Sequence, residues 1–343
     1  MKFIRSRNIE KVNSYSVSFN KLQYISNNSL YLEDKLLTDN TDCLGIFLNK
    51  NLLIYSNYTD YKTYVFNIET DVIKNIGQMN VQNLVYNNYY LGYQYDDNFN
   101  STIVLLNNNF EVKQDIDFKN IIIEFIHDKI GIQNYNREKL VAYLLPSNKI
   151  LWQIDISQLN HTHKKQDKNV IEAYKILGVF ENDLLVILDD SSILRIDIET
   201  GEIKKRFNMV LFSDTENEVI AQYNFIQFQD DKLIYYRYGQ YAEYDLESNK
   251  IIYQFDIKED LEKEKLHDNI HSYIKEDDLL YFYISGFGSF SFPSIVVLNT
   301  RTREIVWKHI WDNQDVFYKD FQKSETALYL LDSGNTLHIF EKI

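Results

Sequence analysis

Two histidines and an aspartate in one short segment are the residues of this chain that best suit a metal ion. His161 and His163 stand two positions apart, and Asp167 follows them. Two imidazoles and a carboxylate are ligands that zinc accepts. Three lysines share the segment and would repel a cation: Lys164, Lys165 and Lys168. The charge balance therefore predicts a solvated loop and no metal site.

Carboxylates occur in adjacent pairs, a feature that bears on acid–base catalysis. The pairs are Asp189-Asp190 and Asp277-Asp278. Catalysis by two carboxylates needs side chains that oppose each other at a defined separation, and neighbours on one turn do not provide this. Asp is common in turns because its side chain hydrogen-bonds the local backbone. No nucleophile elbow, phosphate-binding loop or zinc motif occurs in the sequence. We therefore expect no enzymatic activity, no catalytic residue and no cofactor.

Aromatic side chains are the second kind of residue that could carry a function, here binding. The candidates are Phe287, Phe290 and Phe292 in the segment 286–294, and Tyr58 and Tyr61 in the segment 57–62. Aromatic anchors dominate the centres of protein interfaces. Tyr beside Asp and Asn also suits sugar binding, and the phenylalanines could instead fold back over their own sheet. The spacing of these residues does not distinguish the three uses.

A recurring turn-plus-strand pattern defines the elements that must position these residues. From Leu44 onward a short polar turn precedes an apolar strand seven times, and successive copies start 37 to 55 residues apart. A hairpin follows in each of the six complete units, as in LRIDIETGEIKKRF (194–207). Strands rich in Tyr, Ile, Leu and Phe, separated by tight polar turns, indicate antiparallel meanders. Repetition at this length indicates the blades of a β-propeller.

The sequence predicts an all-β fold, a seven-bladed β-propeller of four-stranded antiparallel blades in a single domain over residues 1–343, with six or eight blades left open. The six complete blades are expected at 44–77, 81–118, 121–156, 171–207, 223–257 and 271–310. The last blade has only three strands, at 317–323, 327–332 and 336–342. A strand from residues 1–43 must therefore complete it, which joins the two ends of the chain in one sheet.

The hairpin copies IDIETGEIKKRF and VLNTRTREIVWKHI resemble the repeats of quinoprotein-like (PQQ-type) β-propellers. The likeness covers about ten residues in each blade, and Trp152 and Trp307 occupy the position at which that repeat often carries Trp. The resemblance implies the propeller architecture. It implies no quinone cofactor, because quinoprotein dehydrogenases have paired adjacent cysteines and Cys43 is the one cysteine of this chain.

Four long connections between strands point to one face of the propeller as the binding surface. They are 157–170, 208–222, 258–270 and 286–294. Three would join consecutive blades and the fourth would join the second and third strands of one blade, and both kinds of connection leave a propeller on the same face. Long loops often carry function, although neutral insertion would lengthen them too. Asp214 and Glu216 in the second connection are expected to be rim acids that set the association rate.

Composition and charge narrow the class of partner. The net charge is −14 and the isoelectric point is near 5.0, which argues against nucleic acid because phosphates require a basic surface. An acidic surface instead favours a basic protein partner. A lone cysteine fits a reducing compartment, and the sequence has neither a signal-like apolar segment nor an apolar run of about 20 residues. We therefore expect a cytoplasmic monomer that does not bind membranes.

These observations favour a non-catalytic, protein-binding β-propeller of the bacterial cytoplasm. One concrete form of this hypothesis is an immunity-type protein that neutralises a toxin or another basic partner. The alternative is a carbohydrate-binding or sugar-cleaving propeller, which requires Tyr and Asp side chains to converge at the mouth of the central channel.

Overall fold

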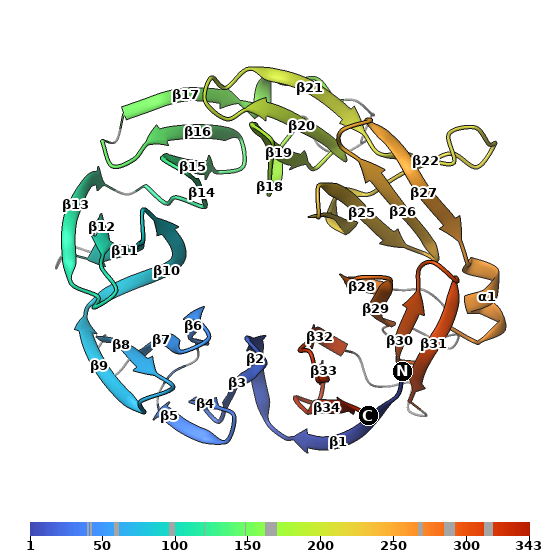
Figure 1. Ribbon diagram of the computed structural model, residues 1–343, viewed down its shortest axis with the longest axis horizontal. Helices are drawn as coiled ribbons and strands as arrows, with labels where there is room; N and C mark the ends of the chain where they lie inside the picture. Colours follow the sequence, from blue (N-terminus) through green and yellow to red (C-terminus); the bar gives the residue numbers. More distant parts are fainter. Residues whose placement is uncertain are drawn as a thin grey trace. The chain divides into compact units, whose positions relative to one another are not determined.

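The computed structural model (Figure 1) describes residues 1–39, 41, 43–57, 62–95, 100–119, 121–147, 149–161, 170–266, 270–284, 292–311 and 318–343. These residues form eight four-stranded antiparallel sheets, the blades of a β-propeller. The chain divides into two compact units. The first unit comprises Met1–Gln78, Arg237–Gln240 and Asp256–Ile343, and the second comprises Met79–Tyr236 and Tyr241–Phe255.

The first four blades follow one another along the chain. The first blade contains β2 (Val12–Ser18), β3 (Lys21–Ser26), β4 (Ser29–Leu32) and β5 (Lys35–Asp39). The second contains β6 (Ile46–Asn49), β7 (Leu52–Asn57), β8 (Lys62–Asn67) and β9 (Val72–Gly77). The third contains β10 (Met79–Tyr86), β11 (Tyr89–Tyr95), β12 (Ser101–Leu106) and β13 (Val112–Lys119). The fourth contains β14 (Phe125–His127), β15 (Ile130–Tyr135), β16 (Lys139–Leu144) and β17 (Lys149–Asp155).

The remaining blades use the rest of the chain and its first strand. The fifth contains β18 (Ala173–Phe180), β19 (Asp183–Leu188), β20 (Ser192–Asp197) and β21 (Ile203–Asn208). The sixth contains β24 (Ile226–Gln229), β25 (Lys232–Arg237), β26 (Gln240–Asp245) and β27 (Lys250–Asp256). The seventh contains β28 (Ile270–Glu276), β29 (Leu279–Ile284), β30 (Ser294–Asn299) and β31 (Glu304–Ile310). The closing blade contains β32 (Tyr318–Lys323), β33 (Ala327–Asp332), β34 (Leu337–Lys342) and β1 (Phe3–Ile9).

The structure confirms the propeller fold and its closure by an N-terminal strand, and it fixes the blade count. The count of seven favoured by the repeat is one short, and eight, which the sequence left open, is found. The additional blade is the first, at Val12–Asp39, a stretch within the residues 1–43 from which the sequence analysis expected only the strand that completes the last blade. In the closing blade β1 pairs antiparallel with β34 from Phe3↔Lys342 to Ile9↔Leu337, and the two ends of the chain lie close together (Figure 1).

Tight turns join the strands because Asn and Asp tolerate left-handed backbone angles. Asn87 and Asn88 have φ of 47° and 65°, and Asp230 and Asp231 have φ of 50° and 59°. Positive φ at both central residues is the type I′ turn, whose twist matches that of the flanking strands. Gly201 has a stricter role, because its φ is +77° and a Cβ there would lie 2.6 Å from the Trp152 side chain. The Gly of the repeat IETGEI is therefore required by packing.

The hydrophobic core lies between neighbouring blades. In one cluster, Val12, Tyr15, Leu22 and Tyr24 of the first blade pack against Ala327, Tyr329, Leu331, Leu337 and Ile339 of the closing blade. The hydroxyl of Tyr15 donates to the carbonyl oxygen of Tyr329 at 3.0 Å, so the buried phenol has a partner within the same interface. Similar clusters join the third blade to the fourth and the fourth to the fifth.

A buried histidine on β34 ties β1 to the rest of the closing blade. Arg5 Nη2 lies 2.5 Å from His338 Nδ1, and His338 Nε2 lies 2.8 Å from Asp332 Oδ2. Arginine only donates, so Nδ1 accepts and Nε2 carries the proton that is donated to Asp332. His338 is therefore a neutral imidazole held between a cation on β1 and an anion at the end of β33. Burial lowers the pKa of His338, the Asp332 hydrogen bond opposes this effect, and the Arg5 charge adds to it.

We predict that His338 makes the protein less stable in acid. A histidine with a lowered folded pKa binds fewer protons folded than unfolded, so its contribution is fully present above the unfolded pKa of about 6.5 and declines as pH falls below it. The free energy of unfolding, measured in urea between about pH 7.5 and about pH 5, should decline less steeply in His338→Gln than in wild type. His127→Gln, which changes a partly exposed histidine on β14, serves as the control for loss of a histidine elsewhere in the fold. Equal slopes in wild type and His338→Gln would refute the prediction.

Candidate protein-binding surface

The four long connections lie where the sequence predicts them. Three join consecutive blades, β17 to β18, β21 to β24 and β27 to β28, and the fourth joins β29 to β30 within one blade. The third contains the short helix α1 (Lys258–Lys263), and the first begins with the 3-10 helix η1 (Ile156–Gln158). The connection from β21 to β24 is described throughout and forms the candidate surface.

Apolar residues at both ends anchor the β21–β24 connection. It folds into a small hairpin of β22 (Val210–Leu211) and β23 (Val219–Ile220), followed by the 3-10 helix η2 (Tyr223–Phe225). Met209, Leu211 and Ala221 are fully buried, and the Ala221 amide donates to the Met209 carbonyl at 2.9 Å. The base of the hairpin is therefore fixed to the blade. Its middle extends away from the sheets (Figure 1).

The tip of this hairpin carries three exposed carboxylates, which we call the acidic tip: Asp214, Glu216 and Glu218. No hydrogen bond or ion pair links their side chains to other residues that the structure describes. The turn beneath them is ordered, since the amide and hydroxyl of Thr215 both donate to the Phe212 carbonyl, at 2.9 and 2.8 Å. The Phe212 amide in turn donates to Gln254 Oε1 at 3.0 Å. Uncompensated negative charge is therefore held on a fixed turn.

A tyrosine pair, one exposed and one half-buried, lies at the ends of two long connections. Tyr174, at the start of β18, is 38% exposed. Its ring meets that of Tyr223 in η2 edge-on, with centroids 4.6 Å apart and an interplanar angle of 68°. The Tyr223 amide donates to Ser191 Oγ at 3.2 Å, which fixes the backbone below the ring. Sequence analysis missed this pair, and the one available signal was that each tyrosine stands where a long connection ends.

The structure places only part of the predicted site. Asp214 and Glu216 lie on the acidic tip, beside Glu218, which the sequence did not single out. Four of the predicted anchors lie outside the described residues: Phe287, Phe290, Tyr58 and Tyr61. Phe292 is half-buried, and its carbonyl accepts a hydrogen bond of 2.9 Å from Ser294 Oγ.

The predicted histidine segment is described only at its first residue. His161 is partly buried, and its two ring nitrogens have no hydrogen-bond partner among the residues that the structure describes. His163 and Asp167 lie outside the described residues. Within the part of the chain that the structure describes, no group of three or more His, Cys, Asp or Glu side chains is placed to hold a metal ion.

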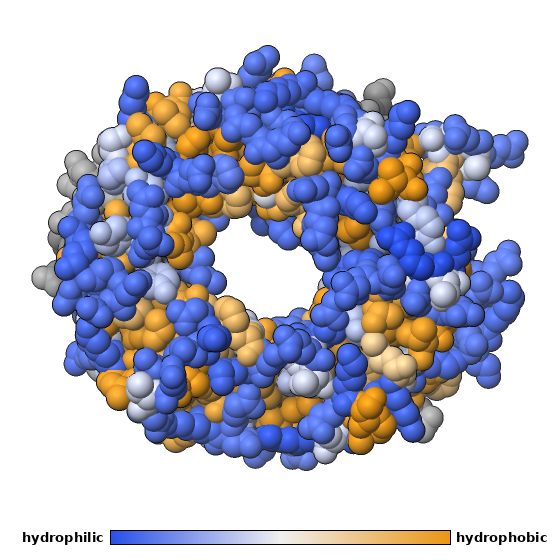
Figure 2. Space-filling view, viewed as in Figure 1, coloured by the Kyte–Doolittle hydropathy of each residue, from blue (hydrophilic) through white to orange (hydrophobic). Residues whose placement is uncertain are grey.

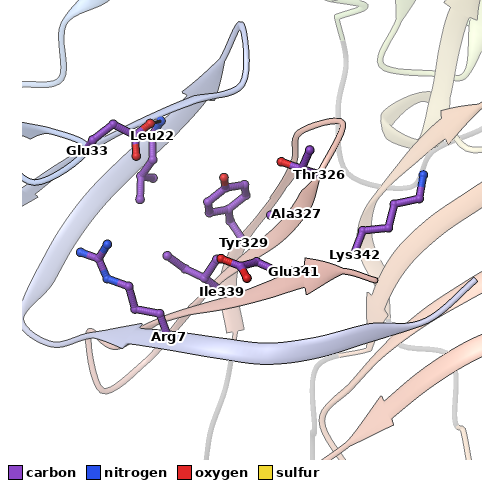
Figure 3. Close-up of a pocket in the computed structure, with 9 residues that line it drawn as sticks. All are labelled: Arg7, Leu22, Glu33, Thr326, Ala327, Tyr329, Ile339, Glu341 and Lys342. Carbon is purple, nitrogen blue, oxygen red and sulfur yellow. Dashed lines mark hydrogen bonds between the residues drawn. The ribbon is translucent and has the colours of Figure 1, made fainter.

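A pocket of about 400 Å³, the closure pocket, lies where the first blade meets the closing blade (Figure 3). Its floor is apolar and buried, and is formed by Leu22, Ala327, Tyr329 and Ile339. Its rim is polar and exposed, and is formed by Arg7, Glu33, Thr326, Glu341 and Lys342. Ala327 pairs with Glu341 and Tyr329 pairs with Ile339 across β33 and β34, so these four side chains share one face of the sheet.

Hydrogen bonds and ion pairs fix two sides of the closure pocket. The Leu22 amide donates to Glu33 Oε1 at 2.8 Å, and the Glu33 amide donates to the Leu22 carbonyl at 2.7 Å. Arg7 forms a two-point ion pair with Asp34. Burial raises the pKa of the Tyr329 hydroxyl, a Ser324 hydrogen bond opposes this, and the charges of Glu33 and Glu341 add to it. Both carboxylates therefore act on the same hydroxyl at the floor of the pocket.

Comparison with known proteins identifies the fold. No protein-family model matches the sequence, and neither does any curated protein. BamB from Moraxella catarrhalis aligns over 99% of this chain and 100% of its own, with a TM-score of 0.55 at 7% identity. The computationally designed Ika8 protein aligns over 97% and 96% of the two chains (TM-score 0.54, 12% identity). Sqt1 of Saccharomyces cerevisiae aligns over 99% and 98% (TM-score 0.53, 11% identity). At such identities the likeness establishes a shared fold alone.

Buried carboxylates of this propeller are occupied by structural partners. Asp190 Oδ1 accepts from the amide and hydroxyl of Ser192 at 3.0 and 2.6 Å, and its other oxygen pairs with Arg206 at 2.6 Å. Asp189 Oδ1 accepts from the Glu172 amide at 3.1 Å. Asp190 therefore makes the local turn contact that the sequence predicts, whereas Asp189 binds the backbone just before β18. In the described residues, no helix is long and apolar enough to cross a membrane, and hydrophilic residues cover much of the face in Figure 2.

Proposed function

We propose that residues 1–343 act as a single non-catalytic propeller domain that binds a basic protein partner. The acidic tip carries this proposal, because its three exposed carboxylates have no partner among the described residues. Charges left unpaired on an ordered turn gain energy when an opposite charge approaches, and they speed the encounter with it. The net charge of −14 extends the same attraction over the whole protein.

The partner that we propose is a basic toxin, which this protein would neutralise as a monomeric, immunity-type protein of the bacterial cytoplasm. The acidic composition and the single cysteine support this form of the proposal. Phe287, Phe290, Phe292, Tyr58 and Tyr61 remain its proposed aromatic anchors. They belong to connections of the kind that carry function in propellers, and interface energy concentrates in such side chains.

The acidic tip predicts a charge-dependent capture. Wild-type protein and the variant D214N/E216Q/E218Q are used as baits in lysate of the organism that encodes the chain. We expect the variant to retain about tenfold less, or still less, of the basic proteins that wild type retains. The substitutions remove negative charge and keep the size of the side chains. Quantitative mass spectrometry of the retained proteins measures this ratio.

A matched control distinguishes the effect of the acidic tip on capture from the effect of the net charge of the protein. The variant E199Q/E202Q/E247Q removes three exposed carboxylates from short turns of the fifth and sixth blades and should retain the wild-type set. Equal losses in both variants would mean that only net charge matters. A retained set that is acidic, or unchanged in the tip variant, would contradict the proposal.

The second candidate function is carbohydrate binding, and the Tyr174–Tyr223 pair favours it. Exposed aromatic rings offer apolar faces that sugars stack on, and the phenolic hydroxyls add hydrogen bonds. A glycan array distinguishes the two functions. Binding that is lost in Y174A and kept in the tip variant would favour the sugar, whereas an array without signal would favour the protein partner.

A further inference from the structure

We propose that the closure pocket binds a primary ammonium group at the end of an aliphatic stem, the chemistry of a lysine side chain. The proposal goes beyond the protein-binding function, because it depends on the pocket between the first and closing blades and not on the acidic tip. Figure 3 shows the residues that carry it.

The floor of the pocket suits the aliphatic stem. Leu22, Ala327, Tyr329 and Ile339 are each at most 7% exposed, yet all four line the pocket. Burying methylene groups against such a surface is favourable because it removes apolar area from water. The volume of about 400 Å³ is near the lower end of ligand pockets, which span about 300–1,000 Å³. It therefore accommodates one side chain or a small amine.

The rim of the pocket suits a cationic head. Arg7 is held in an ion pair with Asp34, and the two carboxylates of the rim are Glu33 and Glu341. The Glu341 side chain has no hydrogen bond or ion pair with the described residues. Lys342 is the remaining cation, and its ammonium points away from both carboxylates in Figure 3. A ligand whose stem lies on the floor would place its head between Glu33 on one blade and Glu341 on the other.

Charge and shape exclude the other simple ligands. An anion would meet two carboxylates, and the arginine that could offset them is already paired with Asp34. A planar guanidinium pairs best with a single carboxylate, to which it donates two parallel hydrogen bonds. An ammonium is a compact charge with three donors that rotate freely. Two carboxylates that come from different blades therefore match an ammonium. Lysine also commonly buries its stem and keeps its charged head in water.

Titration of the full-length protein with small probes tests the proposal. The probes are Nα-acetyl-lysine N-methylamide, its uncharged norleucine analogue, and cadaverine. The readout is a methyl NMR spectrum of protein labelled at Ile and Leu, in which Leu22 and Ile339 are assigned with Leu22→Met and Ile339→Val. We expect the lysine probe to shift these two resonances and to bind at least about tenfold more tightly than the norleucine analogue. Ile203, an exposed residue of β21, should not respond.

Substitutions at the rim make the test specific. The variant E33Q/E341Q should weaken the lysine probe by about tenfold or more, since Gln removes charge but keeps the oxygen that accepts the Leu22 amide. The single variant E341Q, which disturbs no hydrogen bond of the described structure, should show part of that loss even if the double variant is unstable. The control E199Q/E202Q removes two exposed carboxylates of the fifth blade and should bind as wild type does.

The probes also distinguish the source of the ammonium group. If the lysine probe binds more tightly than cadaverine, the ammonium group belongs to a side chain of a protein partner. If cadaverine binds as tightly as the lysine probe or more tightly, the ligand is a free amine. Both outcomes support the ammonium site. Three results would overturn it: equal binding of the norleucine analogue, no shift at Leu22 and Ile339, or unchanged affinity in both rim variants. Each can occur whether or not the acidic tip captures a partner.

Discussion

Deletion of residues 1–10 is expected to open the closing blade and leave a protein that melts far lower and self-associates. The deletion removes β1, which pairs with β34 from Phe3 to Ile9. An uncovered β34 would expose a row of backbone donors and acceptors, and such edges recruit other chains. The loss also exposes core, because Phe3 is 5% exposed and meets the Trp307 ring edge-on at 5.1 Å.

The size of this effect follows from the side chains that β1 buries. Removal of a buried Phe side chain alone costs about 3–5 kcal/mol, comparable to much of the stability of a typical domain, about 5–15 kcal/mol. The contact of Arg5 with His338 is lost in addition. Few proteins remain folded after losses of this size, so the melting temperature should drop sharply.

Thermal melting and light scattering measure the two consequences of the deletion. A synthetic peptide of residues 1–11, added in excess, should restore the melting temperature if it takes the place of β1 beside β34. Deletion of residues 1–2, which leaves β1 intact, serves as the control and should change little. A truncated protein that stays monomeric and melts as wild type does would contradict the role of β1.

The repeat predicted seven of the eight blades because their turns carry a recognisable pattern. The second through closing blades were located to within a few residues, for instance 271–310 against the observed Ile270–Ile310. The first blade escaped because its strands are short and its outer turn is Glu33-Asp34, whereas most other copies have Thr or Ser followed by Gly, Asn, Asp or a charged residue. Closure was predictable by counting strands, since three strands of the last blade needed a fourth.

The candidate sites were less predictable because they combine residues that are distant in sequence. The closure pocket unites Leu22 with Tyr329, and only the register of β33 and β34 and the packing of two blades bring these residues together. The Tyr174–Tyr223 contact likewise depends on how two connections end. Asp214 and Glu216 were predictable from charge within a long connection, whereas their lack of partners is a property of the folded hairpin.

Arg206→Met is expected to destabilise the fifth blade by about 3–5 kcal/mol, the usual cost of leaving one member of a buried ion pair alone. The Asp190 side chain is 1% exposed, and its Oδ2 lies 2.6 Å from Arg206 Nη2. Arg206 also donates to Ser192 Oγ at 2.9 Å and to the Asn160 carbonyl at 2.5 Å. One guanidinium therefore offsets a buried charge and holds the start of the β17–β18 connection. Urea unfolding measures the cost.

Two further variants test whether the cost of Arg206→Met comes from the buried Asp190 charge or from the loss of an ion pair alone. Arg301→Met breaks an ion pair of 3.0 Å with Asp278 whose side chains are 46% and 56% exposed, and exposed pairs contribute only about 0–1 kcal/mol because water screens them. Adding Asp190→Asn to Arg206→Met should recover part of the loss, because the buried group left behind is then neutral. If Arg206→Met costs no more than Arg301→Met, or if Asp190→Asn recovers nothing, the buried charge is not what Arg206 stabilises.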